Sequence, residues 1–391
     1  MREHMLFISA RNQNNQDIEG DIRTGNLLAV LLEKFAIDLL VYGDCTSAPA
    51  VEGVAGLKVH TVKRHVTPRR TMLRSLYTLR NYSPFSNADR DMKAMLEELC
   101  GATEYSHVFI AHSLLGNCID RVRQMLPEAV IVTDAQRSES ALSAGQAAVK
   151  RGISKPYHKL NAALVRRDEK RLMNKTGLLL ATSEWDALSF KALSFEDAAK
   201  VHVVPVSIDM KEYPPVPDAH KENRIVLHWN LNTQQGKNAA LLFIKKLYPL
   251  IKEEVPDVQC SIVGENLHAD ILSLVDKDAS LTIADRCSTE AVLRSKVLIS
   301  PLLEGCASRL HILEAWALKT AVVSTARGAE GLNCEHNRNI LLAHSSAEMA
   351  AHVVRLLKEP ELGALLADRA YQTLLKHYEA SEVKAKLLSL V

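Results

Sequence analysis

The sequence predicts an α/β protein made of two doubly wound, Rossmann-like domains that face a central cleft. Short apolar runs alternate with longer helical patterns along the whole chain, and a charged stretch with three prolines interrupts this alternation near the middle. The length of 391 residues also exceeds the size at which one hydrophobic core usually stops growing. Together these observations indicate two domains of parallel sheet covered by helices.

Seven strands are predicted in the first half of the chain. Their Val, Ile and Leu residues form near-continuous runs without strict alternation, which is typical of parallel strands buried on both faces. The intervening segments supply the crossover helices. The strands are "MLFIS" (5–9), "DLLVYG" (38–43), "LKVHTV" (57–62), "HVFIAHS" (107–113), "AVIVTDA" (129–135), "GLLLATS" (177–183) and "VHVVPV" (201–206).

The proline-rich stretch 207–222, "SIDMKEYPPVPDAHKE", is predicted to be the interdomain linker. It separates a first domain, 1–206, from a second, 223–375; the last segment, 376–391, is a C-terminal helix that could pack back on the first domain. The second-domain strands are "RIVLHWN" (224–230), "QCSIVG" (259–264), "LTIAD" (281–285), "VLISPL" (297–302) and "AVVSTA" (321–326), with a further short run, "NILLA".

Composition excludes several classes of protein. A formal charge of +2 argues against a dedicated nucleic-acid binder, and 47% apolar with 24% charged residues is ordinary for a soluble protein. The seven cysteines are scattered without a C-x-x-C pair, which favours a reducing compartment over a disulfide framework or zinc site. We find no signal-peptide pattern and no membrane-spanning apolar run, so we expect a cytoplasmic protein.

Typical phosphate and metal motifs are missing. The chain has no G-x-G-x-x-G and no Walker A sequence. The polar loop after the first strand holds Gly20 ahead of a helix with Arg23 and Thr24, and it could lie near a diphosphate or be an ordinary surface loop. "DRD" (89–91) and "DKD" (276–278) match a metal-binding D-x-D, but neither ends a strand. We therefore expect no metal.

Polar residues follow two neighbouring strands of the first half. His112 ends "HVFIA", where α/β sheets place ligand contacts, although a lone histidine is often structural. Asp134 ends the next strand, and Gln136, Arg137 and Glu139 follow it. This cluster could face an acceptor or simply cap the next helix.

Two basic stretches stand out in the first half. Residues 53–88 hold seven Lys or Arg and no acid, and residues 150–175 hold nine basic residues against two acidic ones. They lack the aromatic platform of single-stranded nucleic-acid binders. Interleaved apolar residues fit an anionic membrane surface or a lipid-linked diphosphate better, with two ordinary solvated helices as the alternative.

The stretch 300–316, "SPLLEGCASRLHILEAW", combines the features of an anion-binding site with a carboxylate that would repel an anion. A strand ends in proline, small residues precede a helix start, and Arg309 lies there. Exposed N–H groups at a helix start together with an arginine would bind a phosphate. Glu314, just over one turn further on, needs a ligand that also carries hydroxyl groups.

The C-terminal half resembles the nucleotide-sugar signature of retaining, glycogen-synthase-like GT-B glycosyltransferases, especially bacterial ones that build surface polysaccharide or lipopolysaccharide. The resemblance is most specific in "PLLEGCASRLHILEAWALKTAVVSTARGAEGL" (301–332). It extends to "GKNAALLFIKKLYPLIKEEVPDVQCSIVG" and, more weakly, to "IEGDIRTGNLL" and "VTDAQRSES", where Gln136 replaces the usual histidine. It implies a GT-B fold with an acceptor-side first domain and a nucleotide-sugar-binding second domain.

The resemblance also implies roles for individual residues. The donor diphosphate would contact the amides of Ser308, Arg309 and Leu310, the Arg309 guanidinium and Lys237. Glu314 would accept hydrogen bonds from the ribose hydroxyls. Two further expectations are His112 near the donor sugar and backbone around Ala284–Arg286 against the base; the full set of expected donor contacts includes Gly20, Arg23, Lys237, Arg286, Ser308, Arg309, Leu310 and Glu314.

Three positions depart from the family pattern. The first glutamate of the family's E-x7-E falls on Cys306, and Glu304, two residues earlier, is either a substitute or a loop charge. The arginine that usually precedes the lysine is missing from "WNLNTQQGK", and Arg309 is a candidate replacement. "ALKTAVV" lacks the usual Gly-x-Pro.

The implied function is metal-independent transfer, with retention, of a hexose from a UDP- or GDP-sugar to a saccharide or lipid-linked acceptor in bacterial surface-glycan assembly. The catalytic candidates are His112, Lys237, Arg309 and Glu304. No cofactor and no nucleic-acid partner are expected, and association with the inner face of the cytoplasmic membrane is a further expectation. The alternatives are a catalytically silent homologue that binds a nucleotide-sugar or a partner, and a sugar-nucleotide epimerase of the same fold.

Overall fold

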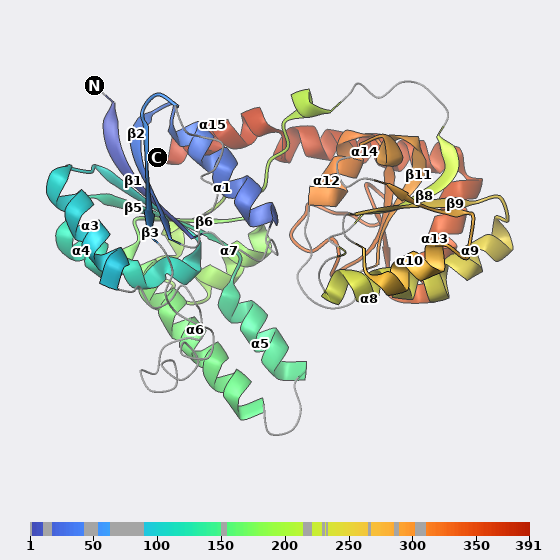
Figure 1. The fold of residues 1–391 in the computed structure, drawn as a ribbon, viewed down its shortest axis with the longest axis horizontal. Coiled ribbons are helices and arrows are strands. Elements are labelled where there is room, and N and C mark those ends of the chain that lie inside the picture. The colour runs from blue at the N-terminus through green and yellow to red at the C-terminus, as the bar shows by residue number, and fades with distance from the viewer. Residues whose placement is uncertain are drawn as a thin grey trace. The chain divides into compact units, whose positions relative to one another are not determined.

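The structure is a computed structural model that describes residues 2–10, 18–42, 54–62, 90–149, 155–213, 221–228, 231, 234–264, 267–284, 289–301 and 310–391. These residues form two compact units (Figure 1). The first unit comprises Met1–Pro205 with Lys384–Val391, and the second comprises Val206–Val383.

The first unit contains a seven-stranded parallel sheet in the order β3-β2-β1-β4-β5-β6-β7. Every strand predicted in the first half of the chain is present. The strands are β1 (Glu3–Ala10), β2 (Phe35–Tyr42), β3 (Leu57–Val62), β4 (His107–Ala111), β5 (Val130–Gln136), β6 (Leu178–Ala181) and β7 (Val201–Val203). The helices are α1 (Ile18–Leu31), α3 (Arg90–Ala102), α4 (Ile119–Met125), α5 (Glu139–Val149), α6 (Lys155–Lys175) and α7 (Glu184–Lys191).

The second unit contains a six-stranded parallel sheet in the order β10-β9-β8-β11-β12-β13. Its strands are β8 (Glu222–His228), β9 (Gln259–Val263), β10 (Leu281–Ala284), β11 (Ser295–Ser300), β12 (Ala321–Thr325) and β13 (Leu341–Ala343). The helices are α8 (Gln234–Leu242), α9 (Tyr248–Glu254), α10 (Ala269–Val275), α11 (Thr289–Arg294), α12 (Leu310–Ala317), α13 (Ser346–Lys358), α14 (Pro360–His377) and α15 (Ala380–Leu390), whose last residues belong to the first unit.

Both faces of the central strands of the second sheet are buried. Ile225, Leu227 and Ile299 pack under α9, α10 and α13, whereas Val226 and Leu298 pack under α12 and α14 (Figure 1). Successive side chains of a strand point to opposite faces, so a strand covered on both sides must be apolar throughout. This burial is the physical reason why the apolar runs of the sequence do not alternate.

The segment predicted as linker is partly built into the second unit. Ile208 is 3% exposed in the core of that unit, and its backbone exchanges hydrogen bonds with Tyr378 and Ala380. A short 3₁₀ turn, Met210–Glu212, follows, and Tyr213 packs on the same core. Residues 214–220 lie outside the described residues.

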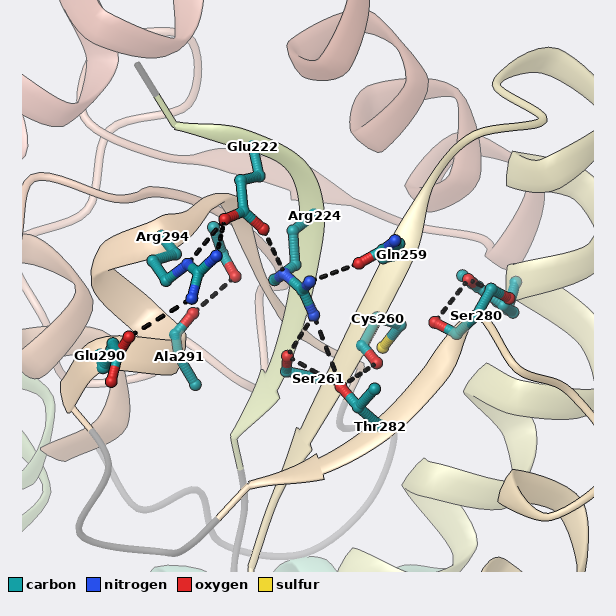
Figure 2. A network of polar contacts seen from close by, with 12 residues as sticks. Glu222, Arg224, Gln259, Cys260, Ser261, Ser280, Thr282, Glu290, Ala291 and Arg294 are labelled. Carbon is teal, nitrogen blue, oxygen red and sulfur yellow. Dashed lines mark hydrogen bonds and ion pairs between the residues drawn. The ribbon is translucent and has the colours of Figure 1, made fainter. Parts of the chain in front are cut away.

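A polar network ties strands β8, β9 and β10 together near their amino ends (Figure 2). Arg224 donates to Ser261, Thr282 and Gln259, and Glu222 bridges Arg224 to Arg294. Hydrogen bonds from Arg224 and Arg294 hold the pKa of Glu222 below its usual value. Ligands of open α/β sheets bind at the opposite, carboxyl edge, so this network is a structural one.

The described part of the chain contains no helix that is both long enough and apolar enough to cross a bilayer.

Candidate functional site

A buried ion pair organises the carboxyl edge of the first sheet. Asp134, near the end of β5, is fully buried, and Arg23 of α1 is 3% exposed. Arg23 donates to both carboxylate oxygens of Asp134, with Nη2 2.7 Å from Oδ1 and Nε 3.0 Å from Oδ2. Its Nη1 donates to the Pro205 carbonyl. The pair therefore fixes α1 against the ends of β5 and β7.

Two residues beside this pair hold backbone conformations that side chains other than glycine rarely adopt. His112 has φ +92° directly after β4, and Gln136 has φ +58° at the end of β5. The amide of His112 donates to the Asp134 carbonyl, and the Gln136 carbonyl accepts from the Thr182 amide. Strain of this kind costs about 1–3 kcal/mol and clusters at binding sites. The order of the first sheet reverses between β1 and β4, so His112 lies at its switch point.

A buried carboxylate accepts hydrogen bonds from the first amides of helix α5. Glu169 of α6 is 4% exposed and accepts from the amides of Glu139 and Ser140, with Ser138 nearby. Burial raises the pKa of Glu169 to about 7, against the lowering effect of these hydrogen bonds. The segment after β5, predicted to face an acceptor or cap a helix, therefore begins a helix whose first amides bind an internal carboxylate.

In the second unit, Lys237 and Glu314 lie on helices that follow adjacent strands. Lys237 is on α8, which follows β8, and Glu314 is on α12, which follows β11. Strands β8 and β11 are paired, and the order of the sheet reverses between them. In open parallel sheets the crevice at such a switch point is the usual ligand site. Two distant segments of the sequence therefore converge on one edge of the sheet.

Lys237 is held by an acid, and lies beside an imidazole, at the start of α10. Its Nζ lies 2.8 Å from Oδ2 of Asp270 and 3.0 Å from Nε2 of His268. His268 is the N-cap of α10, and its Nδ1 accepts from the Asp270 amide. The hydrogen bond from Lys237 is the largest cause of the lowered pKa of Asp270. Asp270 thus provides the negative charge beside Lys237 in this structure.

Glu314 contacts two groups from other segments. Its Oε2 lies 3.2 Å from Nδ1 of His228, the last residue of β8, and its carboxylate lies near the Tyr213 phenol. Burial, and next the charge of Glu314, raises the pKa of the Tyr213 phenol. The Glu314 side chain is 22% exposed, so it reaches the domain surface at the switch point.

Small and hydroxylated residues line the strand ends beside Glu314. His311 of α12 is 4% exposed, and its Nε2 lies 3.1 Å from the Ser300 hydroxyl. A Cβ on Gly328 would lie 2.4 Å from the Ser324 hydroxyl and 3.0 Å from that of Ser300. The loop after β12 therefore needs glycine at 328 to approach the ends of β11 and β12.

The structure places several of the predicted site residues. His112, Lys237, Leu310 and Glu314 lie at the carboxyl edges of their own sheets. Four others lie outside the described residues, and their roles stay predictions: Arg286, Glu304, Ser308 and Arg309. The described residues contain no group of three or more His, Cys, Asp or Glu that could hold a metal.

The structure differs from two expectations for residues near the N-terminus. Helix α1 begins at Ile18, so Gly20 lies in its first turn and not in a loop ahead of it, and its carbonyl accepts from the Thr24 hydroxyl. Arg23 was expected to contact donor phosphate, but its guanidinium is buried on Asp134 and Pro205. Because the Arg23 guanidinium is buried and already paired, it is not available to bind a ligand. The role of Arg23 in the structure is therefore to position α1.

Sequence reasoning missed four contacts of the predicted residues: His228, Tyr213, His268 and Asp270. His228 ends an apolar strand, the same signal that pointed to His112, and could have been found in that way. Tyr213 lies within the predicted linker, and His268 and Asp270 have no local pattern that distinguishes them from surface residues.

Comparison with known proteins supports the interpretation of the second unit. Residues 222–359 match the family model "Glycosyl transferases group 1". A curated relative from Klebsiella pneumoniae, described as an uncharacterized 44.6 kDa protein in the cps region, is 23% identical over 211 residues. That alignment covers 50% of this chain and 54% of the relative, so it spans about half the length of each.

Solved structures match the chain over its whole length. Anabaena Alr3699/HepE in complex with UDP aligns with a TM-score of 0.68 at 13% identity and covers 100% of this chain and 99% of that one. Sucrose-phosphate synthase from Thermosynechococcus elongatus gives 0.70 at 14% identity, covering 100% and 98%. Staphylococcus aureus TarM gives 0.65 at 12%, covering 100% and 99%. The predicted fold class is confirmed: two parallel-sheet α/β units of the GT-B type, the second of which matches the group 1 glycosyl transferases over residues 222–359.

Proposed function

We propose that this protein is a glycosyltransferase that moves a hexose from a UDP- or GDP-sugar to a saccharide or lipid-linked acceptor. One observation supports this most strongly. Within the segment that matches the group 1 glycosyl transferases, Lys237 and Glu314 follow the two strands that flank the switch point of the sheet. A cation and a partly exposed carboxylate suit a ligand with both phosphates and hydroxyl groups.

The second unit would bind the nucleotide part of the donor. Glu314 accepts hydrogen bonds from the ribose hydroxyls, and Lys237 exchanges Asp270 for the diphosphate. Arg309 and the amides of Ser308 to Leu310 add charge and hydrogen bonds at the start of α12. Negative charge on the diphosphate grows as the glycosidic bond breaks, so these cations favour the transition state and take the place of a metal.

The first unit would present His112 to the donor sugar. The strained backbone at His112, fixed by the Asp134 carbonyl, supports a role in placing the ring. The chain has Cys306 where the family's first glutamate is expected, and Glu304 is the neighbouring carboxylate. Without a protein nucleophile, the acceptor oxygen attacks the anomeric carbon on the face that the diphosphate leaves. The acceptor proton then passes to the departing phosphate oxygen, and configuration is retained.

A place in bacterial surface-glycan assembly is the finer part of this proposal. The Klebsiella relative is described as lying in a cps region, and the family resemblance of the sequence points in the same direction. Exposed basic residues of α6, such as Lys155, Lys159 and Arg166, would favour an anionic lipid surface or lipid-linked acceptor at the inner face of the cytoplasmic membrane.

The alternative is a catalytically silent homologue that binds a nucleotide-sugar. Cys306 favours it, because the cysteine replaces a carboxylate of the family pattern. Both proteins would bind nucleotide through Glu314, but only an enzyme would accelerate cleavage of the donor.

The experiment begins with a thermal-shift screen of UDP, GDP and ADP and their hexose conjugates. A ligand at a hundredfold excess over its Kd stabilises the folded state by about 2.7 kcal/mol. The conjugate that binds is then incubated with the protein, and release of the free nucleoside diphosphate is measured by chromatography. Slow release without acceptor supports the enzyme. Binding without release supports the silent homologue, and failure of every nucleotide to bind would overturn both.

A further inference from the structure

Two side chains that no family motif assigns lie beside Glu314. His228 comes from the end of β8, and Tyr213 comes from the turn before it, so three separate segments meet at one carboxylate. Tyr213 packs on the core formed by Ile312 and Trp316, which also anchors the helix of Glu314. The side chains of His228 and Glu314 are 14% and 22% exposed.

The two contacts differ in kind. The Tyr213 phenol packs on the same core as the helix of Glu314, near enough to the carboxylate for its charge to raise the pKa of the phenol. Nδ1 of His228 lies 3.2 Å from Oε2, but its alignment falls short of a full hydrogen bond in this conformation. The imidazole ring of His228 also lies edge-on to that of His311, with centroids 6.4 Å apart, and His311 is anchored on Ser300. The His228 ring is therefore backed by the buried His311 ring.

We propose that His228 and Tyr213 are positioning residues that set the plane of the Glu314 carboxylate, and that through it they make the site select ribose hydroxyls. The inference rests on the proposed function, in which Glu314 accepts from the ribose. A carboxylate on a helix can rotate about its terminal bond, and that freedom weakens directional hydrogen bonds to a ligand. A ring nitrogen and a hydroxyl that packed segments hold beside the carboxylate restrict this freedom before the ligand arrives.

The structural alternative is that these contacts only attach α12 to the sheet. In that case, removing them lowers the melting temperature and weakens all nucleotides equally. A positioning role predicts a selective loss of affinity. The loss falls on ligands that carry the ribose hydroxyls, and ligands without them are affected little.

The experiment compares a nucleoside diphosphate with its 2′,3′-dideoxy form by titration calorimetry. The nucleotide is whichever of UDP, GDP and ADP binds the parent most tightly. The variants are Tyr213→Phe, His228→Leu and His228→Asn, in which the amide nitrogen takes the place of Nδ1. Tyr248→Phe is the matched control, because its hydroxyl is also buried in the second unit but donates to the Val258 carbonyl at 3.0 Å.

The parent should bind the ribose form at least about tenfold more tightly than the dideoxy form, since hydrogen bonds to a charged acceptor are strong. Tyr213→Phe and His228→Leu should lower this ratio several-fold, His228→Asn should restore most of it, and Tyr248→Phe should leave it unchanged. If the ratio is unchanged in Tyr213→Phe and His228→Leu while Glu314→Gln lowers it, the positioning inference is wrong and the proposed function stands. If the parent binds no nucleotide, the proposed function itself fails.

Discussion

Removing the charge of Asp134 should destabilise the first unit strongly. Asp134→Asn leaves the Arg23 guanidinium buried without a counter-charge, at a site where the two side chains are 0% and 3% exposed. Loss of one partner of a buried pair typically costs about 3–5 kcal/mol. For a domain of this size, each kcal/mol lowers the melting temperature by about 2–4 °C, so a fall of roughly 6–20 °C is expected.

The assay is hydrogen exchange read by mass spectrometry. Peptides from β5 and α1 report opening of the first unit, and peptides from β8 and β11 report the second unit, which should be unaffected. Arg23→Met combined with Asp134→Leu removes both charges and should recover most of the stability, because well-packed apolar pairs replace buried ion pairs at little cost. Glu222→Gln is the exposed control. The side chains of Glu222 and Arg294 are 35% and 56% exposed, so the loss should stay below about 1 kcal/mol.

Two results would refute this reasoning. A cost below about 1 kcal/mol for Asp134→Asn would mean that the pair is hydrated in solution. A double variant as unstable as the single one would mean that the loss comes from packing and not from the uncompensated charge.

The other predictions concern pH, catalysis and membrane binding. Burial raises the pKa of Glu169 from 4.5 to about 7, so the stability this group contributes is fully present below pH 4.5 and is lost as the pH rises through 7. The loss is roughly 3 kcal/mol, and urea titrations of Glu169→Gln should show a flatter pH profile, whereas an unaltered profile would contradict the shift. Lys237→Ala and Arg309→Ala should each lower kcat by about 10²–10³ and be non-additive when combined, because both cations act on one diphosphate; a normal kcat in Lys237→Ala would exclude the shared role. Substitution of three arginines by glutamine should weaken binding to anionic vesicles by about 1 kcal/mol per residue in co-sedimentation, and unchanged binding would mark them as ordinary surface residues: Arg69, Arg70 and Arg74.

The strands could be predicted because burial on both faces requires apolar residues along the strand itself, which are visible in the local sequence. The central strands of the two sheets coincide with near-continuous apolar runs, which do not depend on which strand pairs with which, whereas the edge strands β3 and β10 are partly exposed. The strand ends were equally visible, and His112 was found in that way. The backbone strain at His112 was not, because φ depends on the hydrogen bond from its amide to Asp134 on the neighbouring strand.

Contacts between distant segments produce no comparable pattern in the local sequence. Arg23 and Asp134 are separated by 111 residues. In the sequence, an arginine that pairs with a distant carboxylate looks the same as an arginine that binds a phosphate. The prolines that follow Tyr213 predict a linker, although the Tyr213 ring packs on the second unit. Lys237 of α8 is paired with Asp270 of another helix, and no pattern near Lys237 in the sequence indicates this contact. These contacts are fixed by topology, and a single sequence does not encode them in any short pattern.

The most direct test of the account is calorimetric titration of the parent and Glu314→Gln with the nucleoside diphosphate that binds the parent. Glutamine keeps the size of the side chain and removes its charge, so the fold should be preserved and the melting temperature without ligand should be nearly unchanged. A charged acceptor of the ribose hydroxyls contributes about 1.5–3 kcal/mol against about 1 for a neutral one, so the Kd should rise by roughly 3- to 30-fold. Equal affinity in the two proteins would contradict the claim that Glu314 binds the nucleotide of a sugar donor.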